Sequence, residues 1–220
     1  GTNTGVVFCR AVRLGRCAVN IGIITGSHRK ASQSAKVGRF LSGLLETQFG
    51  ASTWMRDLGA APLPLWDEDI WNDGPQWQQL KALSAQLTES DGVIIVAPEW
   101  HGMAPAAIKN FFLCVGMPEL AHKPALACAV SAGEGGAYVI AELRMSSYKN
   151  NRVCWLPEHL IARSVKDICN DDATQNDTDL QAEFGARAQY ASTLLLAYAA
   201  ALKPIREDTK IDHSRFMNGM

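Results

Sequence analysis

The chain has 220 residues, 47% of them hydrophobic and 20% charged, and its formal net charge at pH 7 is −1. This length and composition predict one globular domain with a core of its own. The balanced charge disfavours nucleic acid and anionic membranes as the main partner. No apolar run reaches the roughly 18 residues of a membrane-spanning helix, and the six cysteines lack metal-ligand spacing. We therefore expect a cytoplasmic protein with reduced thiols and no metal site.

Residues 1–18 differ from the rest of the chain. They carry Arg10, Arg13 and Arg16, no acidic residue and no clear periodicity. A basic, acid-free N-terminus is typical of transit peptides, but we favour an upstream extension or an expression remnant. The predicted domain therefore spans residues 19–204 and is followed by a C-terminal tail at residues 205–220.

Short apolar runs predict strands at residues 19–25, 51–55, 92–97 and 125–130. The run at 92–97 has no polar position, which is typical of a central parallel strand covered on both faces. Two segments compete for a fifth strand, residues 152–155 and residues 160–165.

Apolar residues at helical spacing predict helices that include residues 37–45, 77–87, 105–115 and 137–143, and a last helix from residue 178 to about residue 195. In the last of these, Thr178 and Gln181 have the spacing of a capping box. Strand and helix thus alternate, which predicts a parallel sheet with helices on both faces and no second domain. The expected strand order is 2-1-3-4-5, in which flavodoxin-like proteins hold FMN beside the first and third strands.

The loop after the first predicted strand suits an anion. Residues 26–34 read GSHRKASQS and lead into a helix, whose N-terminus presents unpaired N–H groups. Hydroxyls at Ser27, Ser32 and Ser34 and the guanidinium of Arg29 match the oxygens of a phosphate monoester. The loop matches neither the P-loop nor the GxGxxG pattern, which disfavours nucleoside triphosphates and the usual dinucleotide site. The alternative is that the serines only cap the helix.

A long connection at residues 59–77 contains three of the six tryptophans, together with several prolines and glycines. Such a loop in a compact domain is usually functional or part of an interface. The alternative is that the tryptophans fold back onto the core of their own domain.

Several motifs together resemble the NAD(P)H-dependent FMN reductase family, which includes quinone, chromate and azo-dye reductases. Residues 26–34 resemble its phosphate loop, GSxRxxSxN, and residues 98–110 (PEWHGMAPAAIKN) resemble its PEYNxSxPGxLKN segment. The pairs KP at 123–124, GG at 135–136 and LR at 143–144 match its KP…GG…LR stretch, and PLPLWD at 62–67 resembles the loop before its second helix. The resemblance covers roughly residues 20–145.

This resemblance implies a flavodoxin-like α/β three-layer sandwich with a five-stranded parallel sheet that binds FMN and uses NAD(P)H. Ser27, Arg29, Ser32 and Ser34 would hold the FMN phosphate. The flavin ring would be bordered by Pro98, Glu99, Trp100, His101 and Gly102 on one side and by Ser131 and Gly133 on the other. The chain departs from the family pattern in having Ser34 for Asn, Trp100 for Tyr and His101 for Asn.

The implied reaction is hydride transfer from NAD(P)H through FMN to a quinone or free flavin, with ping-pong kinetics and no catalytic acid or base. The implied assembly is a homodimer or homotetramer. For Glu99, a structural or interface carboxylate is expected rather than a general acid. His101 could protonate a quinone, and Lys109 is expected to pair with carboxylates. The competing hypotheses are an electron carrier without turnover of its own and a domain that has lost flavin.

Overall fold

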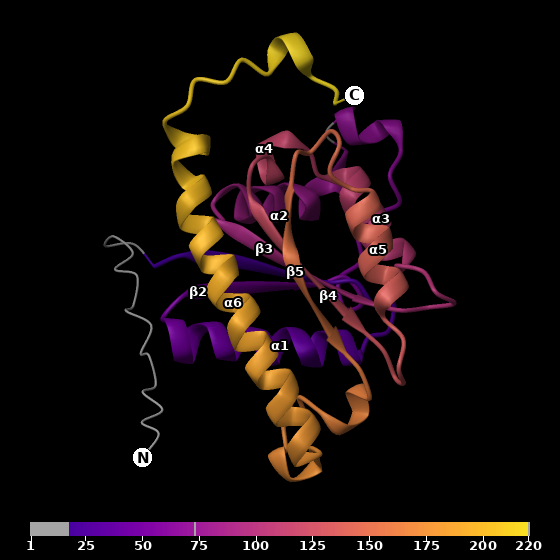
Figure 1. Ribbon diagram of the computed structural model, residues 1–220. Helices are drawn as coiled ribbons and strands as arrows, with labels where there is room; N and C mark the ends of the chain where they lie inside the picture. Colours follow the sequence, from indigo (N-terminus) through magenta and orange to yellow (C-terminus); the bar gives the residue numbers. More distant parts are fainter. Residues whose placement is uncertain (1–17, 73, 220) are drawn as a thin grey trace, which may run out of the picture.

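A five-stranded parallel sheet forms the centre of the computed structural model, which describes residues 18–72 and 74–219 (Figure 1). The strand order is β2-β1-β3-β4-β5, and every neighbouring pair is parallel. The strands are β1 (Asn20–Thr25), β2 (Ser52–Asp57), β3 (Gly92–Pro98), β4 (Pro124–Val130) and β5 (Cys154–Ala162). The predicted fold class and strand order are confirmed. The segment at residues 1–18, predicted to be an extension, lies outside the described residues except for Ala18.

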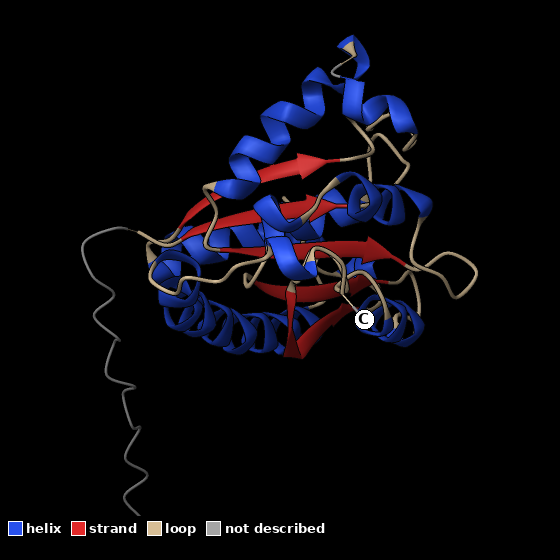
Figure 2. Cartoon of the chain, turned by 90° about the horizontal axis from the view of Figure 1, so that it is seen from above, coloured by secondary structure: helices blue, strands red, loops and turns tan. Residues whose placement is uncertain are grey.

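Helices cover both faces of the sheet, as Figure 2 shows. The helices are α1 (Gln33–Phe49), α2 (Gln78–Thr88), α3 (Ala106–Cys114), α4 (Met117–Leu120), α5 (Ala137–Met145) and α6 (Thr178–Glu207). One core cluster joins the sheet to α1 and α6, and the other joins it to α2, α3 and α5. Ile94 and Val96 of β3 belong to the first cluster, and Val93 and Ile95 belong to the second. Because successive side chains of a strand point to opposite faces, burial on both faces accounts for the uninterrupted apolar run.

The two segments that compete for the fifth strand, residues 152–155 and 160–165, overlap the two ends of one strand, β5, which runs from Cys154 to Ala162. Pro157 lies between them and hides the continuity of the strand in the sequence. Proline is tolerated there because β5 is an edge strand and because its pairing with β4 has a register shift between residues 155 and 159, the stretch that contains Pro157. Arg144 of α5 donates to the carbonyl of Leu156 at 2.8 Å and also to that of Pro157.

The predicted capping box at the start of α6 is wrong. The N-cap is Asp177, whose Oδ1 accepts from the N–H groups of Asp179 at 3.0 Å and Leu180 at 2.9 Å. Gln181 instead accepts from the N–H of Cys169 at 2.7 Å. An aspartate is an equally good N-cap, so the capping-box spacing one residue later was a coincidence of sequence. The helix also continues through Pro204 to Glu207, beyond the predicted end of the domain at residue 204.

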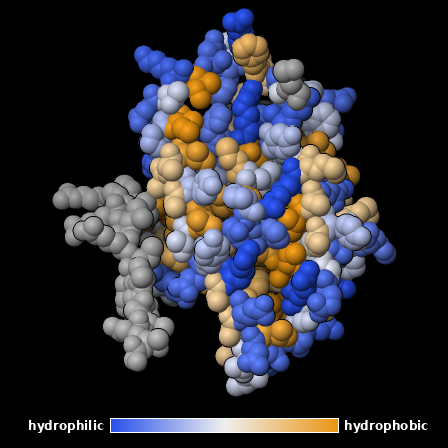
Figure 3. Space-filling view, viewed as in Figure 1, coloured by the Kyte–Doolittle hydropathy of each residue, from blue (hydrophilic) through white to orange (hydrophobic). Residues whose placement is uncertain are grey.

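Hydrophilic and apolar side chains are intermixed on the face that carries α6, as the space-filling view shows (Figure 3). In residues 18–72 and 74–219, no helix combines the length and the apolar character that crossing a lipid bilayer requires.

Candidate flavin site

Three loops meet at the carboxyl edge of the sheet, where the backbone ladder continues past the strands. The N–H of Gly26 donates to Val96 at 2.8 Å, that of Glu99 to Val130 at 2.9 Å and that of Ser131 to Ala162 at 2.9 Å. Each of the three loops therefore starts fixed to the next strand in the sheet. The residues expected at a flavin site are brought to one edge in this way.

The serines of the first loop, residues 26–34, have three different roles. Ser32 is the N-cap of α1 and accepts from the N–H of Ala35 at 3.0 Å. Ser27 accepts from the N–H of Arg29 at 3.1 Å and is buried. Both hydroxyls act as acceptors here, so their own protons remain available for an anion. The capping alternative therefore explains Ser32 only.

Ser34 is 1% exposed, and its hydroxyl has no hydrogen-bonding partner among the described residues. Buried polar groups are normally paired, so an orphaned hydroxyl in the first turn of α1 is available to bond a ligand at this helix end. A phosphate at this helix N-terminus would supply a partner. The residues present therefore fit the phosphate end of FMN.

Gly59, in the connection after β2, supports this loop and was not expected from the sequence. A Cβ there would lie 2.3 Å from the carbonyl oxygen of Arg29 and 2.8 Å from that of Ser27. Asp57 holds the glycine in place, because its Oδ1 accepts from the N–H of Gly59 and from the hydroxyl of Thr25, both at 3.0 Å. The only sequence signal was a glycine at the start of the long connection.

Gly59→Ala should therefore displace the phosphate loop and destabilise the protein by about 1–3 kcal/mol, the usual cost of overpacking. Chemical denaturation measures this change. Gly43→Ala is the matched control, because it is a helix-interior glycine whose added Cβ meets nothing within 4 Å. It should stabilise the protein by about 0.5–1 kcal/mol. Equal effects of the two substitutions would contradict a supporting role for Gly59.

The second loop is a tight hairpin after β3. The N–H of Trp100 donates to Met103 at 3.1 Å, and the N–H of Met103 donates back at 2.8 Å. His101 and Gly102 have φ angles of 50° and 71°, and positive φ at both central residues is what a type I′ turn requires. The amides of Glu99 and Trp100 are thus already bonded within the protein. The main-chain N–H groups that this loop can still offer to a ligand are those of His101 and Gly102.

A cation–π contact joins the first two loops. The guanidinium carbon of Arg29 lies 5.2 Å from the centre of the Trp100 ring. Tryptophan offers the best aromatic face for such a contact. The departure from the family's tyrosine therefore has a structural consequence, since Trp100 helps to orient the expected phosphate ligand Arg29.

Glu99 ties the second loop to the third. Its Oε2 accepts from the N–H of Gly136 at 2.5 Å, and Gly135 packs so closely that a Cβ would lie 2.7 Å from Oε1. These contacts support the structural reading of Glu99 over the general-acid reading. Within the third loop, Ser131 accepts from the N–H of Gly133 at 3.3 Å, and the space where a Cβ of Gly133 would stand is open.

The residues after the second loop act as scaffold. Lys109 lies 2.5 Å from Glu142, as predicted for pairing with a carboxylate. Partial burial raises the pKa of Glu142, but the bonds from Lys109 and the N–H of Ala104 outweigh this and hold the pKa below its usual value. Asn110 donates to the carbonyl of Pro64 at 2.7 Å and accepts from the N–H of Trp66 at 2.8 Å. The long aromatic connection is fixed to α3 through this side chain.

The tryptophans of residues 59–77 differ in burial: one folds back onto the core, and two remain exposed, as a functional or interface loop would require. Trp77 is 2% exposed and packs in the core, whereas Trp66 and Trp71 are 39% and 75% exposed. The rings of Trp66 and Trp71 meet edge to face, with centroids 5.7 Å apart. They border a cavity of about 750 Å³ between α2 and the end of α3. This cavity does not include any residue of the three loops at the carboxyl edge.

Within the described ranges, no three His, Cys, Asp or Glu side chains are placed to hold a metal ion.

Comparison with solved structures gives the same fold. The chain superposes on the flavoenzyme NAD(P)H:(acceptor) oxidoreductase of Paracoccus denitrificans with a TM-score of 0.63 and 23% identity, covering 84% of this chain and 98% of that one. It also superposes on the apo form of an NADH:FMN oxidoreductase with a TM-score of 0.61 and 15% identity, covering 81% and 90%. At these identities the likeness shows the fold alone.

Curated relatives are similar in sequence over part of the chain. A quinone reductase of Escherichia coli strain K12 is 31% identical over 125 residues, 55% of this chain and 65% of that protein. An NADPH azoreductase of Bacillus sp. strain OY1-2 is 28% identical over 126 residues, 56% and 66%. A quinone reductase of Pseudomonas putida is 28% identical over 123 residues, 54% and 63%. The chain thus matches slightly less than two thirds of the length of these relatives. Residues 19–167 match the family described as NADPH-dependent FMN reductase, and the chain belongs to that family.

Proposed function

We propose that the protein is an FMN-dependent oxidoreductase that takes hydride from NAD(P)H and passes it to a quinone or to free flavin. The observation that carries this proposal is the orphaned, buried hydroxyl of Ser34 in the phosphate loop of a chain that belongs to this family. Bound FMN supplies the hydride chemistry, and the protein positions it and controls access.

The chain's own residues would divide the binding work among the three loops. Ser27, Ser32 and Ser34 offer hydroxyl protons to the phosphate, and Arg29 offers a planar set of N–H donors with a full positive charge. The hairpin at residues 98–103 and the turn at residues 131–136 would border the ring. A Cβ at Gly133 would meet nothing within 4 Å, and such open space beside the ring would suit a site that two substrates enter in turn. If they share that place, the kinetics are ping-pong.

No residue is needed as a catalytic acid or base for hydride transfer. The carboxylate of Glu99 is already engaged by the N–H of Gly136. His101 is exposed at the tip of the hairpin and is the candidate proton donor to a reduced quinone. Two buried free thiols, Cys128 and Cys169, support a cytoplasmic location.

The test is anaerobic stopped-flow on the FMN-loaded protein, with the flavin absorption band as the readout. We expect NADPH or NADH to bleach the band faster than about 1 s⁻¹, the lower end of common turnover numbers. Steady-state double-reciprocal lines against a quinone should be parallel. A band that persists for many minutes would indicate an electron carrier, and failure to bind FMN would indicate a domain that has lost flavin.

We further propose that the protein forms a homodimer or homotetramer through Trp66 and Trp71. Exposed, paired tryptophans are typical of interface cores. Replacing both by serine should shift the assembly toward the 23.9 kDa monomer in light scattering at micromolar concentration. Tyr148→Ser is the control, because Tyr148 is also exposed but lies outside the connection. A wild-type chain that is monomeric at this concentration would refute the proposal.

A further inference from the structure

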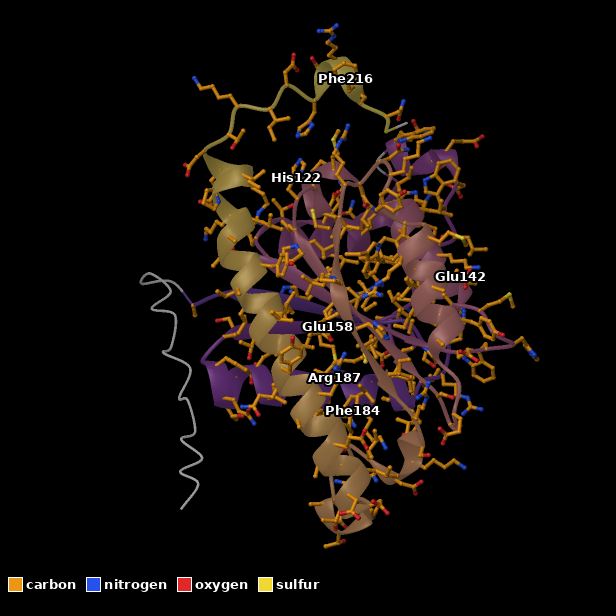
Figure 4. All side chains as sticks on the ribbon, viewed as in Figure 1. His122, Glu142, Glu158, Phe184, Arg187 and Phe216 are labelled. Atoms are coloured by element: carbon orange, nitrogen blue, oxygen red, sulfur yellow. The ribbon has the colours of Figure 1, made fainter. Side chains whose placement is uncertain are left out.

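A second cavity, of about 500 Å³, lies at the amino edge of the sheet, opposite the three loops. Its walls are residues 117–118 and 121–123, the end of α6 at residues 205–207, and residues 209, 211 and 213 of the C-terminal tail. We call it the tail cavity. Figure 4 shows His122 on the body of the protein, below the part of the tail that carries Phe216.

The tail is attached to the body on both sides of this cavity. The ring of His213 stacks on that of His122, with centroids 5.8 Å apart and planes 21° apart. Arg152 donates to the carbonyl of Phe216, and the N–H of Gly219 donates to Asn150 at 3.1 Å. The tail residues that line the cavity are therefore held in place rather than adjacent to it by chance.

Four basic side chains line the tail cavity: Lys123, Arg206, His122 and His213. Lys123 is 4% exposed, and the side chain of Arg206 is 13% exposed. Glu207 is the one carboxylate on the wall, and it lies 3.7 Å from Lys203. Asp91 pairs with Arg206 at 3.4 Å. The wall thus carries four basic side chains and one carboxylate, while Asp91, Glu89 and Glu119 act on Lys123 from outside the wall.

Lys123 is the least compensated of these cations. Its ammonium donates to the carbonyls of Leu87 and Thr88 at the end of α2, which leaves one of its three protons unused. In the described part of the chain, no carboxylate forms an ion pair with it, although Asp91, Glu119 and Glu89 act on it from further away. Burial, together with the charge of Arg206, lowers the pKa of Lys123 to about 8. A bound anion would stabilise the charged form of this buried ammonium group.

His122 is a second side chain at the tail cavity with an unsatisfied hydrogen-bonding group. Its Nε2 is buried and has no hydrogen-bonding partner within residues 18–72 and 74–219. Burial, His213, Arg152 and Arg206 all lower the pKa of His122, so its surroundings are unfavourable to further positive charge unless an anion is present.

We propose that the tail cavity binds a small phosphate-bearing anion, with Lys123, Arg206 and the two histidines as its donors. Several donors on the wall of one cavity suit a phosphate group, which carries more than one charge and several acceptor oxygens. The volume exceeds that of a phosphate group alone and lies within the range of small-molecule sites. The apolar side chains of Met117, Ile205 and Ile211 would contact the organic part of a phosphate monoester.

The competing explanation is that Lys123 serves only to bond the last carbonyls of α2. Calorimetric titration with inorganic phosphate separates the two, with sodium chloride at matched ionic strength as the reference. The protein is loaded with FMN beforehand, so that the phosphate loop is blocked. The same titration on Arg29→Ala without FMN keeps the result independent of the proposed flavin site, because Arg29 lies at the opposite edge of the sheet.

We expect saturable phosphate binding that is weakened about tenfold or more by Arg206→Gln and by His213→Ala, as loss of a bond to a charged group implies. Lys210→Gln is the matched control, since it removes one positive charge from the tail outside the cavity wall and should change the affinity little. His213→Ala decides the question if Arg206→Gln does not fold. Absence of saturable binding, or equal binding by wild type and both cavity variants, would overturn the proposal.

Discussion

Arg29→Ala should weaken FMN binding by about 1.5–3 kcal/mol, the range for hydrogen bonds to a charged group, while riboflavin binding changes little. Riboflavin lacks the phosphate that Arg29 is expected to hold. Fluorescence titration of both ligands measures the difference. Lys30→Ala is the matched control, because Lys30 is the next residue and equally exposed but outside the family's motif. Equal losses for FMN and riboflavin would make Arg29 a structural residue.

The same titrations with FMN and riboflavin test the role of Trp100. If Trp100 acts by orienting Arg29, Trp100→Ala should cost about 0.5–1 kcal/mol of FMN affinity and should add nothing in the Arg29→Ala background. If Trp100 instead stacks on the flavin ring, its loss should weaken riboflavin and FMN alike. Trp100→Tyr should retain most of the affinity, since a smaller aromatic face remains available to the guanidinium.

Gly136→Ala should cause the largest loss of stability among these substitutions. Gly136 has a φ of 106°, and an added Cβ would lie 2.4 Å from Cγ2 of Ile161. Backbone strain contributes about 1–3 kcal/mol, and overpacking against a stiff β-branched side chain contributes about 1–3 kcal/mol more. The N–H of Gly136 would also move away from Glu99, which would release the third loop from the second.

Gly133→Ala is the matched control within the same turn. Its φ is not in the left-handed region, and an added Cβ meets nothing within 4 Å. The free energy of unfolding should therefore stay nearly unchanged, as urea denaturation can show. If substrates enter beside Gly133, its turnover should fall although its fold is intact. A protein that tolerates both substitutions equally would refute the role assigned to Gly136.

The sequence predicted those features that depend on local periodicity. The uniform apolar run of β3 and the helical spacing of α1 were sufficient for the sheet, its layers and, with the family motifs, its strand order. The loops at residues 26–34, 98–103 and 131–136 were predicted to meet because carboxyl ends of parallel strands share one edge.

Most individual contacts between distant segments were not predicted. Pro157 concealed the continuity of β5, because its tolerance depends on the strand being at an edge. Periodicity separates Trp77, which shares the apolar spacing of residues 77–87 and is buried, from Trp71, but it does not predict how the exposed Trp66 and Trp71 pack against each other. The bond between Glu99 and Gly136 joins residues 37 positions apart, and the contact between Arg29 and Trp100 depends on how two loops fold toward each other.

The free edge of β5 has a consequence for how copies of the chain can associate. An unpaired edge is a template on which another chain can add a strand, the starting point of aggregation. Here Pro157 removes one donor, and Arg144 occupies the carbonyls of Leu156 and Pro157. Growth of the sheet across this edge into a continuous intermolecular ladder is thus opposed by the chain itself.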